Sequence, residues 1–67
     1  MSRLIVREHD SKYSLIKGPL RDWLRDNGIP ATYSAKDRGW LIRNERVADV
    51  VALAQHDRFA VTVGGVR

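Results

Sequence analysis

A chain of 67 residues, of which 43% are hydrophobic and 30% charged, is long enough for one folded domain but leaves little room for a deep active site. The lack of cysteine excludes a disulfide framework and a thiolate zinc site. Twelve Lys and Arg against eight Asp and Glu give a formal charge of +4, which favours an anionic partner.

No apolar run in the sequence approaches the roughly 20 residues that a helix needs to span a bilayer. The first residues also lack the apolar region of a signal peptide. We therefore expect a cytoplasmic protein with no membrane partner.

The first predicted element is a strand from Arg3 to His9. Its consecutive apolar residues 4–6 predict burial on both faces, or close to it, and a central place in the sheet. The next segment, 13–17, is ambiguous, because Tyr13 and Ile16 fit either the start of a helix or a simple approach to the Gly18-Pro19 pair.

A helix is predicted over residues 19–27. Pro19 suits the first helical position, where its missing N–H costs nothing, and Gly28 is the expected left-handed stop. The apolar stripe of this helix consists of Leu20, Trp23 and Leu24. Trp23 is therefore expected in the core.

Residues 31–35 and 39–43 are predicted to form a hairpin around the turn 36–38. Gly39 is expected to supply a positive φ in that turn.

A second helix is predicted from the N-cap Asn44 to about His56. Its apolar residues recur at helical spacing: Val47, Val50, Val51 and Ala54. Phe59, Val61 and Val63 then alternate as in a strand with one buried face. We expect one domain over 1–63 and a flexible tail over 64–67.

The predicted order β-α-β-β-α-β is that of a split βαβ, or ferredoxin-like, α+β domain. Such a domain has a four-stranded antiparallel sheet with two helices on one face. Its other face is open, and there such folds bind nucleic acid, a partner chain or a second copy of themselves.

The segment Tyr33-Ser34-Ala35-Lys36-Asp37-Arg38-Gly39-Trp40 and the helix that follows it resemble the HARP (HepA-related) domain over about 30–54. That family has a tyrosine, a turn with a basic residue, a tryptophan and then a helix, and it accompanies helicase-type motors. The resemblance implies a DNA-binding accessory module without motor activity. In style, the chain also resembles small basic α+β proteins of phage genomes.

The leading candidate site is the hairpin with Tyr33, Lys36, Arg38 and Trp40. Its aromatic rings could stack on bases while its cations neutralise phosphates. Alternatively, the two aromatics form a cross-strand pair that packs on the second helix. Because Lys36 and Arg38 have little structural reason to be buried, the functional expectation rests on the turn more than on the rings.

The sequence contains two further basic groups. Lys17, Arg21 and Arg25 would line one helical stripe, which is either an anion-binding surface or an ordinary solvated face with an Asp22–Arg25 pair. Arg43 and Arg46 flank the start of the second helix, where they either extend a basic patch or pair with Glu45 and Asp49.

Catalytic chemistry finds no support in the sequence. His9 and His56 match no metal-ligand spacing, and the serines have no partner base. We therefore expect no enzyme activity, no cofactor and no metal.

Together these features predict a small non-enzymatic nucleic-acid-binding accessory module, with DNA as the expected ligand. The alternative is a protein-interaction module, such as a phage-type factor that binds a host protein or forms a homodimer through the open sheet face.

Overall fold

The computed structural model describes residues 2–64, and in this range it has five strands, two α-helices and one 3-10 turn. In chain order these are β1 (Arg3–Glu8), β2 (Tyr13–Lys17), α1 (Arg21–Asp26), β3 (Thr32–Ser34), β4 (Gly39–Arg43), η1 (Asn44–Arg46), α2 (Val47–His56) and β5 (Ala60–Gly64). The predicted α+β class with two helices is confirmed.

The sheet has five strands in the order β3-β4-β2-β1-β5. Neighbouring strands are antiparallel except for the parallel pair β1 and β5. The prediction of a four-stranded antiparallel sheet was therefore wrong. The additional strand is the ambiguous segment Tyr13–Lys17, which pairs with β1 on one side and β4 on the other.

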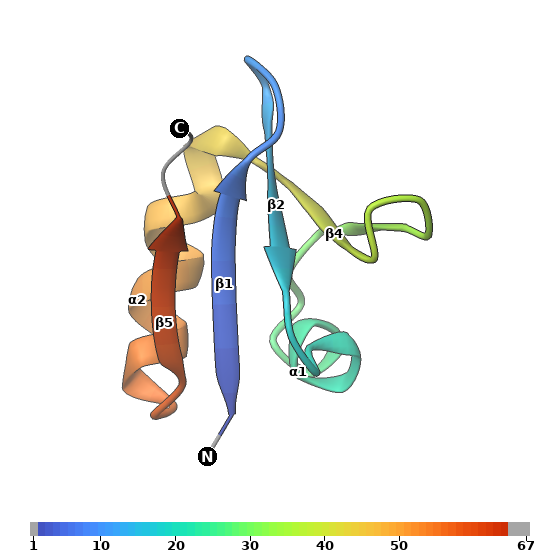
Figure 1. The fold of residues 1–67 in the computed structure, drawn as a ribbon. Coiled ribbons are helices and arrows are strands. Elements are labelled where there is room, and N and C mark those ends of the chain that lie inside the picture. Colours follow the sequence, from blue (N-terminus) through green and yellow to red (C-terminus); the bar gives the residue numbers. More distant parts are fainter. Residues whose placement is uncertain (1, 65–67) are drawn as a thin grey trace.

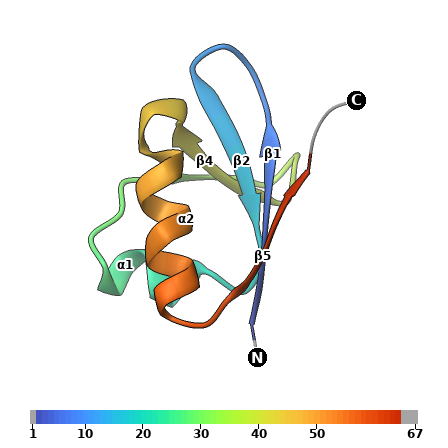
Figure 2. The ribbon, with the colours of Figure 1, turned by 90° about the vertical axis from the view of Figure 1, so that its left-hand side faces the viewer.

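Both helices cover the same side of the sheet (Figure 2). Figure 1 views the sheet from the other, open side, with α2 behind the strands. Between sheet and helices lies a single core of buried residues: Leu4, Val6, Ile16, Leu20, Leu24, Ile42, Val50 and Ala54. We call the two sides of the sheet the helix side and the open face.

Strand β1 is internal, as predicted, but it is not buried on both faces. Leu4 and Val6 are buried on the helix side, whereas Ile5 is half-buried and Arg3 and Arg7 are exposed. At the end of β5, Val63 remains 67% exposed, so the predicted buried face of that strand does not extend to Val63. Strand β5 includes Gly64, so the predicted start of the flexible tail at residue 64 was wrong, and the rest of that predicted tail, residues 65–67, lies outside the described range.

The predicted helix cap at Asn44 was wrong. The residue before η1 makes no side-chain cap, and the Asn44 amide instead binds the β1–β2 turn through the carbonyls of Asp10 and Ser11, at 3.3 and 3.0 Å. Its Oδ1 accepts a 2.6 Å hydrogen bond from the buried Ser14 hydroxyl. Satisfying the buried hydroxyl of Ser14 outweighs the local helix cap.

The β3–β4 turn occupies residues 35–38, and the residue with positive φ is Arg38, at 55°, rather than Gly39. Gly39 is required for space instead. A Cβ there would lie 2.8 Å from the Ile16 carbonyl oxygen and 2.9 Å from Leu15 Cδ1.

None of the helices among the described residues has the length and apolar character needed to cross a membrane.

The two helices end in the same hydrogen-bonding pattern around a residue in the left-handed conformation. After α1, Gly28 has φ 64°, and the next N–H, of Ile29, donates to the Leu24 carbonyl. After α2, Arg58 has φ 67°, and the N–H of Phe59 donates to the Ala54 carbonyl. Both ends form a Schellman motif, in which glycine is the favoured central residue.

This similarity predicts opposite effects of substitution at the two helix ends. Gly28→Ala is expected to lower the free energy of unfolding by about 1 kcal/mol, because alanine carries a Cβ into the left-handed region. Arg58→Gly is expected to raise it by about 0.5 kcal/mol, since relief of strain exceeds the entropic cost of glycine. Urea unfolding of the two variants measures both values, and equal signs would contradict the expectation.

Candidate functional site

The open face is formed by alternate strand residues that point away from the helices. The residues of β1, β2 and β4 that belong to the core between sheet and helices have even numbers, so the residues between them lie on the other side of the sheet. The open face comprises Thr32 and Ser34 of β3, Gly39, Leu41 and Arg43 of β4, Tyr13, Leu15 and Lys17 of β2, Arg3, Ile5 and Arg7 of β1, and Ala60, Thr62 and Gly64 of β5.

Four of these open-face residues are cations and none is an acid. The cations are Arg3, Arg7, Lys17 and Arg43. Of the carboxylates, Glu8 is at an even position of β1 and lines a hollow with Val6 and Ser14 on the helix side, and the others belong to helices or turns. Two of them reach the rim of the open face: Glu45 Oε2 lies 3.7 Å from Arg43 Nε, and Asp37 Oδ2 accepts a 2.9 Å hydrogen bond from the Ser34 hydroxyl. The open face therefore carries most of the protein's excess positive charge.

An apolar strip crosses the middle of the open face between these cations. Leu41 lies opposite Leu15 in the register, and Ile5 lies diagonally beyond Leu15. Arg43 and Arg7 lie on one side of this strip and Lys17 and Arg3 on the other.

At the centre of the strip Leu15 packs over Gly39. Leu15 is only 6% exposed although no helix covers it, and its Cδ1 occupies the space that a side chain at position 39 would need. The exposed apolar surface of the strip therefore comes mainly from Leu41 and Ile5, which are half-buried.

At one end of the strip the open face is hollowed. This hollow has a volume of about 320 Å³ and is lined by Tyr13, Pro30, Ala31, Thr32, Leu41 and Arg43. It combines one aromatic ring, a proline, a hydroxyl group and a guanidinium. Such a set can accept a flat polar ring with an anionic group next to it.

The backbone at Tyr13 is fixed by Asp10. Asp10 Oδ1 accepts hydrogen bonds from the backbone N–H groups of Lys12 and Tyr13, both at 2.8 Å. The bonds from Lys12 and then Tyr13 stabilise the carboxylate and lower the pKa of Asp10 below its ordinary value of 3.8. Asp10 thus holds the turn that leads into the hollow.

The predicted aromatic pair lies on the opposite side of the sheet. The rings of Tyr33 and Trp40 meet edge to face with centroids 5.0 Å apart. Trp40 is half-buried and packs against the core, whereas Tyr33 is 49% exposed. Both line a shallow groove beside the entry to α1, at residues 18–22. The two rings form a cross-strand pair, as the alternative interpretation predicted. The groove that they line adjoins α1, whereas that interpretation placed the pair on the second helix.

The other predicted site residues are dispersed over several surfaces. Lys17 and Arg43 belong to the open face, Lys36 and Arg38 to the β3–β4 turn, and Arg21, Arg25 and Arg46 to helical segments. Arg25 makes the predicted pair with Asp22, at 3.2 Å. Lys17 is in a strand, so the predicted helical stripe of Lys17, Arg21 and Arg25 does not exist.

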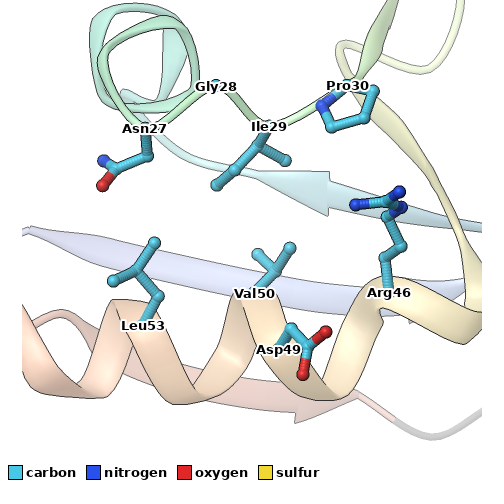
Figure 3. A pocket seen from close by; sticks show the side chains of 8 residues that line it. All are labelled: Asn27, Gly28, Ile29, Pro30, Arg46, Asp49, Val50 and Leu53. Carbon is cyan, nitrogen blue, oxygen red and sulfur yellow. The ribbon is translucent and has the colours of Figure 1, made fainter.

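Arg46 lines a separate small cleft between the loop 27–30 and α2 (Figure 3). Ile29 faces Val50 and Leu53 across this cleft of about 140 Å³, and Arg46 and Asp49 also line it. Its charged lining is one cation and one acid, so the cleft offers no concentrated charge.

Sequence reasoning missed Arg3, Arg7 and Tyr13. The signal for the two arginines was present, because Arg3, Ile5 and Arg7 alternate with Leu4 and Val6. Tyr13 could not be placed without knowing that its segment is a central strand.

No family of known proteins, no curated protein and no solved structure matches the chain. The resemblance to the HARP domain over 30–54 therefore stays a prediction from the sequence.

The lowered pKa of Asp10 predicts a pH dependence of stability. The unfolded carboxyl has the higher pKa, so the contribution of Asp10 is complete above 3.8 and is lost as the pH falls through the lower pKa of the folded state. The difference in unfolding free energy between the wild type and Asp10→Asn should narrow on acidification. Urea titrations at several pH values measure it, and a constant difference would contradict this role.

Proposed function

We propose that the protein is a non-enzymatic nucleic-acid-binding module whose binding surface is the open face, with DNA as the expected ligand. The observation that carries this proposal is the placement of Arg3, Arg7, Lys17 and Arg43 on a face whose strand residues include no acid. A sequence-independent attraction to phosphates follows from such a surface.

The apolar strip favours nucleic acid over a simple polyanion. A polyphosphate or an acidic peptide would satisfy the cations but would leave Leu41, Leu15 and Ile5 facing charged groups. A nucleic acid carries phosphates at regular intervals with flat, weakly polar bases between them. Cations on both sides of an apolar strip complement that alternation.

Self-association through this face is less well supported. Two copies placed face to face would bring eight cations together without compensating acids on the facing strands. Within residues 2–64, the large hydrophobic side chains classed as exposed are Tyr33 and Val63, and neither is on the open face.

The proposal also includes the absence of catalysis. Among residues 2–64, no three His, Cys, Asp or Glu side chains gather as a metal site would require. On the open face the Ser34 hydroxyl donates to the Asp37 carboxylate at 2.9 Å and accepts from the Asp37 backbone N–H at 3.3 Å, and this contact stabilises the β3–β4 turn.

The test is the salt dependence of DNA binding by two charge-matched double variants. Arg7→Gln with Lys17→Gln removes two charges from the open face, and Arg21→Gln with Arg25→Gln removes two from α1. If each open-face cation neutralises one phosphate, the first pair should reduce the slope of log K against log salt by roughly 1.4 to 1.8. Fluorescence anisotropy with labelled oligonucleotides measures the slope.

The second pair is expected to leave the slope unchanged. A third pair, Lys36→Gln with Arg38→Gln, reports how far the β3–β4 turn takes part. If the wild type binds neither single-stranded nor duplex DNA at low salt, or if the α1 pair weakens binding as much as the open-face pair, the proposal is wrong.

A further inference from the structure

We infer that the hollow beside Tyr13 is a binding site for one unpaired base, which makes single-stranded nucleic acid the ligand of the open face. This inference rests on the proposed function. The base would stack on the ring of Tyr13, and Arg43 would pair with the adjacent phosphate.

The lining of the hollow supports each part of this assignment. Tyr13 and Arg43 are register partners on neighbouring strands, so their side chains leave the sheet from adjacent positions, and both line the hollow. Leu41 of β4 and Pro30 of the loop before β3 contribute apolar lining. The Thr32 hydroxyl can donate to or accept from a base edge.

The hollow is also preformed. The Asp10 carboxylate accepts a hydrogen bond from the backbone N–H of Tyr13, and β2 is paired with β1 on one side and β4 on the other. A ring attached to a fixed internal strand loses little entropy when a base stacks on it.

Duplex nucleic acid does not complement this site. Its bases are stacked and paired inside the helix, so their faces are not available to Tyr13. A duplex would also place phosphates and sugars against Leu41 and Leu15. An unpaired strand can direct bases into the strip and the hollow while its phosphates reach the cations on either side.

The experiment compares two probes of equal charge and length. One is a labelled oligothymidylate of about 12 nucleotides, within the roughly 4–16 nucleotides that single-strand-binding folds cover. The other has the same backbone with abasic sites throughout. The wild type should bind the first about 5- to 150-fold more tightly, which corresponds to one stacked base.

Tyr13→Leu should abolish most of this preference, because leucine fills similar space without a ring to stack on. Tyr13→Phe should restore it. Tyr33→Leu is the matched control, since it removes a more exposed tyrosine from the opposite side of the sheet and should leave the preference unchanged. Circular dichroism establishes that each variant is folded.

The outcomes separate this inference from the proposed function. Salt-dependent binding of both probes with equal affinity would retain the function and overturn the base site. Loss of preference in Tyr33→Leu but not in Tyr13→Leu would also overturn it. If neither probe binds at low salt, and light scattering gives a mass above 7.6 kDa, both proposals fail and the face joins copies of the chain.

Discussion

The structure depends on the burial of one side of the sheet by two short helices. Helix α1 has six residues and α2 has ten, lengths at which an isolated helix is marginal in water. Both are held by the burial of Leu20, Leu24, Val50 and Ala54 against Leu4, Ile16 and Ile42. Each large side chain buried in this way contributes about 1.5–3 kcal/mol, so the strands must direct every second residue toward the helices.

This constraint leaves the intervening residues of the strands free of the core. On β1 that freedom is used for Arg3 and Arg7, which flank Ile5. The open face is therefore cationic without a cost in core packing, since the long basic side chains keep their charge in water. The packing of Leu15 over Gly39 gives the open face a buried apolar contact of its own.

The main errors of prediction have one physical origin. A five-residue segment such as Tyr13–Lys17 is too short for its periodicity to decide between helix and strand, and only its pairing with two neighbours settles it. Asn44 fits a helix cap by local rules, but its side-chain amide instead makes hydrogen bonds to the β1–β2 turn and to buried Ser14. In both cases a segment distant in the chain, β4 for Tyr13–Lys17 and the β1–β2 turn for Asn44, overrides the local preference.

The candidate site likewise combines features that nearby residues determine with features that only contacts between distant segments determine. Helical spacing in the sequence predicted the second helix, glycine at position 28 predicted the stop of the first, and the hairpin offered the pairing of Tyr33 with Trp40 as one of two alternatives, because these depend on residues close together in the chain. Composition alone determined the excess of positive charge. Only the tertiary structure decided which cations share that surface, since strand order brings residues from β1, β2 and β4 together and sends Tyr33 and Trp40 to the opposite side. The reason is that a sheet converts an alternating sequence into two faces, and strand pairing between distant segments decides which residues meet on each face.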